Sequence, residues 1–324
     1  MMKQVPFGMT GVQVSEMCLG TMMFAKRTDA AESDRILSYA LDHGVNFVDT
    51  APMYSDGACE ELLGRILQGR RDKVFLATKV HKGLDRDAIL SSIEESLRRL
   101  QTDRVDLYLI HWPKAGMRIE EIMAALHEVV RSGKARYVGC CNYSAWVVEA
   151  SNAVAALRGW SRLVCNQIPY NPVERGAEIE VLPQARAQRV AVTVYRPVLQ
   201  GILAGKYDPD QPLPADSRSE GDERIARWLQ TYAAGVRFFL QFAREKGVSP
   251  SAVAVAWLRA CPAVTCPIIG PTRFAHIEDA VRAFDFQITP AERDALSKAF
   301  DAGVREETGG RFPELRRDWN LVHE

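Results

Sequence analysis

The chain has 324 residues, 47% of them hydrophobic, with 41 lysines and arginines balanced by 41 aspartates and glutamates. This composition is typical of a globular protein with a sizeable core. A formal net charge of zero argues against nucleic acid or an anionic membrane surface as a partner, because both attract proteins with surplus positive charge. The chain contains no apolar run long enough to span a bilayer and no signal-peptide pattern. Its seven cysteines, an odd number, do not suggest a disulfide framework, so we expect a cytoplasmic protein.

Eight short apolar runs, rich in β-branched residues and bounded by Gly or Pro, predict strands. They cover residues 17–21, 46–50, 74–80, 105–111, 137–141, 163–167, 190–195 and 264–269. Segments with helical periodicity lie between them, at 33–41, 89–100, 119–130 and 144–157. The first seven runs are spaced by roughly 25 to 32 residues, about what one strand, one helix and two loops require. This repeat predicts an α/β fold.

A closed (β/α)8 TIM barrel and an open doubly wound sheet both contain such a repeat. The open sheet usually carries G-x-G-x-x-G after its first strand, whereas here Gly20 is followed by Thr21 and Met22 without that pattern. We therefore expect a barrel that forms a single domain over residues 1–324.

Two regions depart from the regular repeat. Residues 4–7 and 12–14 flank a Gly-containing turn at 8–11, which predicts a β-hairpin that closes the N-terminal end of the barrel. About 70 residues separate the seventh and eighth strands, a length typical of a functional lid or a disordered linker. This long loop includes a polar stretch at 208–222 and a helical stretch at 225–245.

Ionisable side chains end three successive predicted strands. Asp49 ends the second, Lys79 the third and His111 the fourth, with Tyr54 just beyond Asp49. Because the carboxyl ends of barrel strands share one face, these side chains are expected to converge there. A buried ammonium beside the phenol would lower the pKa of Tyr54 from about 10, so that Tyr54 donates a proton near neutral pH. Asp49 would keep Lys79 charged, and His111 would orient a carbonyl or relay the proton. Each residue taken alone could instead be a strand-end polar group that the backbone satisfies.

Six stretches of the chain resemble signatures of the aldo-keto reductase family. They are NFVDTAPMY at 46–54, ATKV at 77–80, VDLYLIHW at 105–112, GCCNYS at 139–144, NQIPYN at 166–171 and GILAGKY at 201–207, in family order. The resemblance implies that the protein reduces an aldehyde or ketone to an alcohol by hydride transfer from nicotinamide C4. It makes Tyr54 the general acid within a catalytic set of Asp49, Tyr54, Lys79 and His111, and Tyr54 and His111 are expected to contact the substrate. Trp112, at the end of a predicted strand, is a candidate wall of the substrate pocket, with ordinary packing as the alternative.

The same resemblance implies that NADP(H), or less often NAD(H), lies across the strand ends. Asn142 and Gln167 would hold the nicotinamide carboxamide, and Tyr195 would stack on the ring. The loop after Tyr195 would wrap the pyrophosphate, where cationic side chains suit the negative charge. The complete set implied to bind the cofactor is Gly20, Thr21, Met22, Asp49, Cys141, Asn142, Gln167, Tyr195, Arg196, Pro197, Val198, Leu199, Gln200, Gly201, Lys206, Arg218, Gly270, Thr272, Arg273, His276 and Asp279.

The segment after the eighth strand resembles the family's site for the adenosine 2'-phosphate. Thr272, Arg273 and His276 stand where hydroxyl or basic side chains are expected, at the start of a helix whose free amides favour anions. Arg273 makes NADP(H) the favoured cofactor, with NAD(H) as the alternative. Three positions depart from the family pattern: Cys141 replaces a common serine, Arg196 replaces a common small residue, and Ala280 replaces a common asparagine that contacts adenine.

Two other functions compete with the reductase. Lys79 at a barrel strand end is also compatible with a Schiff-base aldolase, although Tyr195 and the segment after Gly270 would then lack a role. The resemblance extends to potassium-channel β subunits, so a cofactor-sensing interaction protein with little turnover is the third reading. The cysteines and histidines lack zinc-type spacing, and no metal site is predicted. The substrate is expected to be a small carbonyl compound or alcohol.

Overall fold

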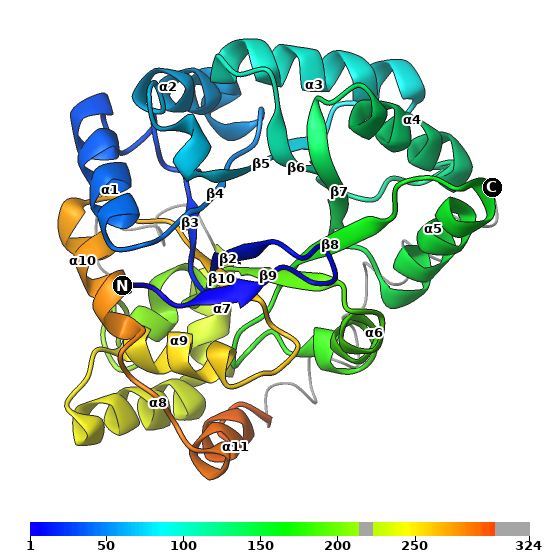
Figure 1. Ribbon diagram of the computed structural model, residues 1–324. Coiled ribbons are helices and arrows are strands. Elements are labelled where there is room, and N and C mark those ends of the chain that lie inside the picture. Colours follow the sequence, from blue (N-terminus) through cyan, green and yellow to red (C-terminus); the bar gives the residue numbers. More distant parts are fainter. Residues whose placement is uncertain (214–222, 302–324) are drawn as a thin grey trace.

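The computed structural model describes residues 1–213 and 223–301. Eight parallel strands close into a barrel in the order β10-β3-β4-β5-β6-β7-β8-β9, and helices surround it (Figure 1). The barrel strands are β3 (Cys18–Gly20), β4 (Phe47–Asp49), β5 (Phe75–Val80), β6 (Val105–Ile110), β7 (Ala135–Cys141), β8 (Leu163–Pro169), β9 (Ala191–Tyr195) and β10 (Cys266–Ile269). Each overlaps one of the eight predicted runs, so the predicted (β/α)8 barrel is confirmed.

The helices between the first seven barrel strands follow the predicted repeat. They are α1 (Ala30–Asp42), α2 (Ala58–Ile66), α3 (Arg86–Leu100), α4 (Ile119–Arg131), α5 (Ala145–Arg158) and α6 (Val181–Gln188). The sequence of α3 shows why it forms: the side chain of Asp85 accepts a hydrogen bond from the amide of Ala88 and caps the helix. Ile89, Ile93 and Leu97 then recur at helical spacing and are buried against the barrel.

The N-terminal hairpin closes one end of the barrel, as predicted. Its strands β1 (Gln4–Pro6) and β2 (Gln13–Ser15) pair antiparallel. Gly8 turns the chain at a φ of +57°, where an added Cβ would lie 2.6 Å from the carbonyl oxygen of Arg189. Phe7 is fully buried, and its ring centroid lies 5.7 Å from that of Phe47 and 5.0 Å from that of Phe75. Because Phe47 and Phe75 begin β4 and β5, Phe7 plugs the N-terminal end of the barrel interior.

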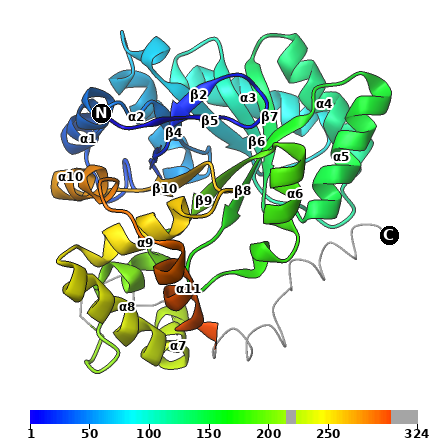
Figure 2. The ribbon, with the colours of Figure 1, turned by 60° about the horizontal axis from the view of Figure 1, so that its bottom comes forward.

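In its described residues, the long connection between β9 and β10 holds three α-helices rather than the one that the sequence predicted. They are α7 (Glu223–Thr231), α8 (Ala233–Lys246) and α9 (Pro250–Arg259). The predicted helix at 225–245 is broken at Tyr232, whose backbone leaves the helical region and whose side chain is buried. After β10 come α10 (Phe274–Ala283) and α11 (Pro290–Lys298). Helices α7, α8, α9 and α11 gather on one side of the barrel (Figure 2).

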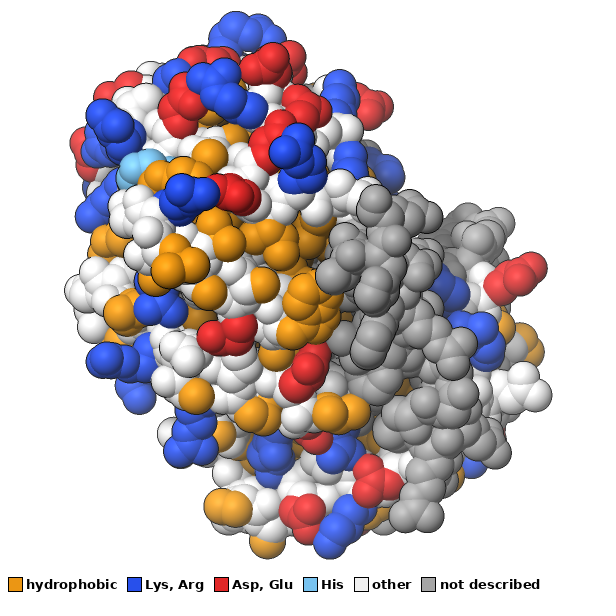
Figure 3. All heavy atoms as spheres, turned by 90° about the vertical axis from the view of Figure 1, so that its right-hand side faces the viewer, with side chains coloured by type: hydrophobic (Ala, Val, Ile, Leu, Met, Phe, Trp, Pro, Cys, Tyr) orange, Lys and Arg blue, Asp and Glu red, His pale blue; other side chains and the backbone are white. Residues whose placement is uncertain are grey.

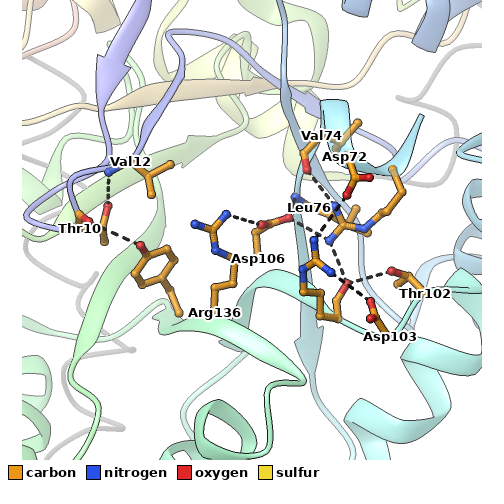
Figure 4. A network of polar contacts seen from close by, with 12 residues as sticks. Thr10, Val12, Asp72, Val74, Leu76, Thr102, Asp103, Asp106 and Arg136 are labelled. Carbon is orange, nitrogen blue, oxygen red and sulfur yellow. Dashed lines mark hydrogen bonds and ion pairs between the residues drawn. The ribbon is translucent and has the colours of Figure 1, made fainter. Parts of the chain in front are cut away.

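A polar network ties three strands together near the N-terminal end of the barrel (Figure 4). The carboxylate of Asp106 on β6 accepts hydrogen bonds from Nη2 of Arg71 at 2.9 Å and from the amide of Leu76 at 3.0 Å. Nη1 of Arg136 on β7 donates to it at 3.2 Å. Asp106 is only 5% exposed, so these partners replace the water that its charge would otherwise bind. The network lies away from the strand ends that carry the ionisable residues.

Replacing Asp106 with alanine is therefore expected to lower the free energy of unfolding by about 1–3 kcal/mol, because buried hydrogen bonds to a charged group are lost. Urea unfolding of wild type and variant measures the loss. Cofactor affinity and turnover of the folded variant should stay at the wild-type level, and Asp106→Asn should lose less stability. A stability equal to that of wild type would contradict this prediction.

The outer surface mixes the two signs of charge. On the face shown in Figure 3, basic and acidic side chains are interspersed rather than gathered into fields of one sign. This agrees with the zero net charge of the chain. Within residues 1–213 and 223–301, none of the helices is long and apolar enough to cross a membrane.

Candidate active site

Three strands deliver ionisable side chains to one end of the barrel. Asp49 is the last residue of β4, Lys79 is the last but one of β5, and His111 directly follows β6. Tyr54 opens the short 3-10 helix η1 (Tyr54–Gly57), which follows β4. Parallel pairing places Asp49 opposite Ala77 of β5. These strands end side by side at the barrel's C-terminal face, where the four residues meet.

A buried ion pair forms the centre of this cluster. Nζ of Lys79, which is fully buried, donates to Oδ1 of Asp49 at 2.7 Å and to the carbonyl oxygen of Thr50 at 2.8 Å. It lies 3.4 Å from the phenolic oxygen of Tyr54. The second oxygen of Asp49 accepts from Nε2 of Gln167 at 2.9 Å. The three protons of the ammonium and both carboxylate oxygens thus have partners, which is what two buried charges require.

Burial and the neighbouring ammonium act on Tyr54 in opposite directions. Burial raises the pKa of the phenol, Lys79 lowers it, and the balance is a pKa of about 12. The expectation that Lys79 brings this pKa below its ordinary value of about 10 is therefore wrong, because withdrawing the phenolate from water outweighs the attraction of the ammonium. Tyr54 remains protonated at neutral pH.

The same opposition acts on Lys79, with a different outcome. Burial alone would lower the pKa of Lys79, but the negative charge of Asp49, followed by Tyr54, raises it above its ordinary value. The ammonium therefore stays charged at neutral pH, as the sequence predicted.

His111 faces the phenol from the next strand. The ring centroids of His111 and Tyr54 are 6.2 Å apart at an interplanar angle of 83°. Burial, and then the positive charge of Lys79, lower the pKa of His111 to about 2, so its imidazole is neutral. Trp112 stacks beside it at 6.3 Å and is 39% exposed. This places Trp112 at the rim of the site.

The two amides implied to hold a carboxamide, Asn142 and Gln167, already have protein partners. Nδ2 of Asn142 donates to the carbonyl oxygen of His111 at 3.1 Å, and its Oδ1 accepts from the hydroxyl of Tyr195 at 2.8 Å. Gln167 is bonded to Asp49. Cys141 is buried, and burial raises the pKa of its thiol, so it remains neutral. Asn142, Gln167 and Tyr195 thus lie at or near the C-terminal ends of β7, β8 and β9.

The loop after β9 takes an irregular, partly left-handed path. Arg196, Leu199, Gln200 and Gly201 all have positive φ, and residues Leu199–Ala204 form the short helix η4. Pro197 and Leu199 are buried, so they offer backbone rather than side-chain contacts to a ligand. The guanidinium of Arg196 lies 5.1 Å above the ring of Tyr195, while its Nε is buried and lacks a hydrogen-bond partner among the described residues. Val198 and Gln200 are half-buried, and Lys206 is exposed.

A second cationic segment lies at the start of α10. Arg273 occupies the N-cap position and is exposed, and the Thr272 hydroxyl lies 3.1 Å from Nδ1 of His276. Burial lowers the pKa of His276, and the positive charges of Arg273 and Lys206 lower it further. The loop after β9 and the start of α10 are therefore close enough for their charges to interact. Cations from two segments at the N-terminus of a helix fit a phosphorylated cofactor.

Glu32, which the sequence analysis missed, also reaches this helix. Its Oε1 accepts from the amide of Phe274, the first residue of α10, at 2.5 Å. Its other oxygen is paired with Arg35 at 3.0 Å. The spacing of Asp29 and Glu32 resembles a capping pair for α1 itself, so the sequence carries no signal of this long-range contact. A carboxylate therefore shares the anion-favouring end of α10.

The remaining cofactor candidates lie at varied depths. Gly20 packs closely against β10, because an added Cβ would lie 2.7 Å from Cγ2 of Ile268. Thr21 is buried and its hydroxyl donates to the carbonyl oxygen of Asp49, whereas Met22 is exposed. Gly270 is exposed, and Asp279 is paired with Arg282 at 2.6 Å. Arg218 lies outside the described residues. In the described part of the chain, no group of three or more potential ligand side chains could hold a metal ion.

Comparison with known proteins agrees with this architecture. The family model described as "Aldo/keto reductase family" matches residues 16–301. The chain is 34% identical to the "Uncharacterized oxidoreductase YrpG" of Bacillus subtilis, over 97% of this chain and 99% of that protein. It is 31% identical to a "Probable voltage-gated potassium channel subunit beta" of Arabidopsis thaliana, over 91% and 95% of the two chains.

A solved structure has the same fold. The thermostable aldo-keto reductase Tm1743, in complex with the inhibitor epalrestat, superposes with a TM-score of 0.76 at 28% sequence identity, covering 92% of this chain and all (100%) of that one. In enzymes with a parallel (β/α)8 barrel, the catalytic residues lie at the C-terminal ends of the strands, and the ionisable residues of this chain lie at the same place. Together with the family match, it follows that the chain belongs to the aldo/keto reductase family.

Proposed function

We propose that this protein reduces an aldehyde or ketone to the alcohol with NADP(H), and that Tyr54 is the general acid. The observation that carries the proposal is the buried pair of Lys79 and Asp49, with the phenolic oxygen of Tyr54 3.4 Å from the ammonium. A proton donor beside a fixed buried cation is an arrangement suited to general acid catalysis. Membership of the aldo/keto reductase family supports the same reaction.

The chain's own residues suit the cofactor. Asn142, Gln167 and Tyr195 would meet the nicotinamide, while Arg196 and Lys206 would meet the pyrophosphate. Arg273, Thr272 and His276 would meet the adenosine 2'-phosphate, where cationic side chains and helix amides favour an anion. When bound, the cofactor supplies the hydride that reduces the carbonyl carbon.

The proton comes from Tyr54, which gives its phenolic hydrogen to the carbonyl oxygen of the substrate. The ammonium of Lys79 stabilises the phenolate that remains, and Asp49 keeps that ammonium charged. The neutral imidazole of His111 can donate one hydrogen bond to the same carbonyl oxygen and so orient and polarise it.

The exposed rim of the site favours apolar substrates. Met22, Met53 and Trp112 follow three different strands and are 43%, 46% and 39% exposed. A rim of two thioethers and an indole suits an aromatic or aliphatic carbonyl compound better than a polyhydroxylated one. We therefore expect hydrophobic aldehydes and ketones to be the better substrates.

The two competing functions make different demands on the site. A Schiff-base aldolase needs a neutral lysine as nucleophile, whereas the pKa of Lys79 is raised by Asp49. A cofactor-sensing protein needs only binding, and the similarity to a probable channel β subunit keeps this function as the alternative.

Steady-state turnover distinguishes these functions. The purified protein is mixed with NADPH or NADH and a panel that pairs aromatic aldehydes with sugar aldehydes, and loss of cofactor absorbance is followed. Sustained multiple turnover supports the reductase. Tight cofactor binding without turnover favours the sensor, and a borohydride-trapped adduct on Lys79 favours the aldolase.

Cofactor choice gives a further prediction. Arg273→Ala is expected to weaken NADPH binding far more than NADH binding, because only NADPH carries the 2'-phosphate.

Glu32→Gln is expected to strengthen NADPH binding, since it removes a negative charge from the end of α10 where that phosphate would lie. Charge effects at a helix end are about 0.3–1 kcal/mol, so NADPH affinity should rise about two- to fivefold. Dissociation constants for both cofactors provide the measurement, and equal changes for the two would reject both assignments.

A further inference from the structure

The chain that follows Tyr54 passes through three consecutive left-handed residues. The φ angles of Ser55, Asp56 and Gly57 are +51°, +53° and +93°. Side chains with a Cβ disfavour this conformation, so at Ser55 and Asp56 it persists only because the surrounding structure imposes it. Helix α2 begins directly after Gly57. The position of Tyr54 therefore depends on what holds the start of α2.

Glu60 holds the first turn of α2 against β5. Its side chain is fully buried, and its Oε1 accepts from the hydroxyl of Thr78 at 2.6 Å. Thr78 is the residue immediately before Lys79 on β5. A single carboxylate therefore connects the helix that follows the phenol with the strand that carries the ammonium.

Arg99 completes this arrangement from the end of α3. Its Nε donates to Oε2 of Glu60 at 2.7 Å, and only 13% of its side chain is exposed. A Cβ added to Gly57 would lie 3.0 Å from Cδ of Arg99, so the arginine stem packs on the last left-handed residue. The two helices meet closely at Gly64, where an added Cβ would lie 2.5 Å from the carbonyl oxygen of Arg99. Arg99 is therefore itself firmly placed.

We propose that Glu60 and Arg99 are positioning residues for Tyr54, which set the distance between its hydroxyl and the ammonium of Lys79 through Thr78 and Gly57. Neither residue contacts the substrate in this scheme, and the inference rests on the proposed function of Tyr54. A buried ion pair is weak support for stability, since an apolar pair of similar size is often as stable. Positioning Tyr54 is therefore a more specific role for the Glu60–Arg99 pair than stabilising the fold.

The test variant is Glu60→Gln combined with Arg99→Met, which removes both charges and leaves neither unpaired. We expect its melting temperature and NADPH dissociation constant to stay close to wild type, while kcat falls about tenfold to a hundredfold, the size of loss that a misplaced catalytic group produces. The matched control is Glu95→Gln, because Glu95 pairs with the same guanidinium at 3.4 Å but is 58% exposed. This control should keep the wild-type kcat. Arg99→Lys keeps the charge beside Glu60, so its kcat should lie between that of the double variant and that of wild type.

Two readouts separate positioning from mere support of the fold. In a Tyr54→Phe background, the double substitution should cause no further loss of kcat, because residues that act through one group are not additive. Ultraviolet difference titration against Tyr54→Phe should show Tyr54 ionising at a different pH in the variant, since the pKa of the phenol depends on both its burial and its distance from Lys79. This second readout does not require turnover.

The outcomes separate the two hypotheses. An inactive wild-type protein would reject the proposed function, while a shifted Tyr54 titration in the variant would still support the positioning role. An active wild type combined with an unchanged kcat, an unchanged titration, or a loss that multiplies with that of Tyr54→Phe would overturn the positioning role. If the double variant fails to fold, Arg99→Lys is judged by the same measurements, with a smaller expected loss.

Discussion

Replacing Tyr54 with phenylalanine is expected to lower kcat by about 10²- to 10⁴-fold, the usual contribution of a general acid. The variant removes only the hydroxyl, so the Lys79–Asp49 pair and the ring contact with His111 remain. Cofactor affinity should therefore be retained. Single-turnover rates together with NADPH titration provide the measurement, and a kcat equal to that of wild type would remove Tyr54 from the acid role.

The pH profile of the wild-type protein follows from the same residue. With a pKa of about 12, Tyr54 keeps its proton throughout the neutral range, so carbonyl reduction should be nearly independent of Tyr54 ionisation there. The rate should fall only as the pH rises toward that value and the phenol loses its proton. The alkaline fall should disappear in the residual activity of Tyr54→Phe, whereas an acid limb unrelated to Tyr54 should persist.

Replacing Lys79 with methionine is expected to abolish measurable turnover and to cost about 3–5 kcal/mol of unfolding free energy. The reason is that the carboxylate of Asp49, almost fully buried, would be left without its cationic partner. Chemical denaturation and steady-state rates test the two parts. Turnover equal to wild type would contradict the first part, and stability equal to wild type would contradict the second.

A compensating substitution serves as the control for this prediction. Adding Asp49→Asn to Lys79→Met removes the unpaired charge, so stability should return toward wild type while turnover remains lost.

The stability that the wild-type Lys79–Asp49 pair contributes depends on pH. Since the pKa of Lys79 is raised in the fold, the stability that its charge contributes is fully present below the unfolded value of about 10.4. It is lost as the pH rises through the higher folded value.

The sequence allowed most of the barrel and the meeting of four side chains to be predicted, because both follow from local pattern. Continuous apolar runs mark strands covered on both faces, and parallel strands necessarily end on one face. Asp49, Lys79 and His111 each end such a run. Their convergence therefore needed no knowledge of side-chain contacts.

Features that depend on burial or on distant contacts were not accessible in the same way. The pKa of Tyr54 was predicted in the wrong direction because the loss of water around the phenol cannot be judged from residue order. Glu60 and Arg99 are 39 residues apart, and Glu32 and Phe274 are 242 residues apart; both pairs meet only through packing. Helix α9 had a readable start, since Ser249 caps it before Pro250, but this signal was overlooked.

The plug that Phe7 forms at the N-terminal end of the barrel restricts the direction from which a molecule can reach Tyr54. The aromatic rings of Phe7, Phe47 and Phe75 pack against one another there, so a molecule cannot reach Tyr54 along the barrel axis from the N-terminal end. Reactants and products must therefore approach and leave from the C-terminal side, where Tyr54 follows β4. A long substrate can place only its reactive end beside Tyr54, because the packed barrel interior leaves no route for the rest of the molecule to pass through.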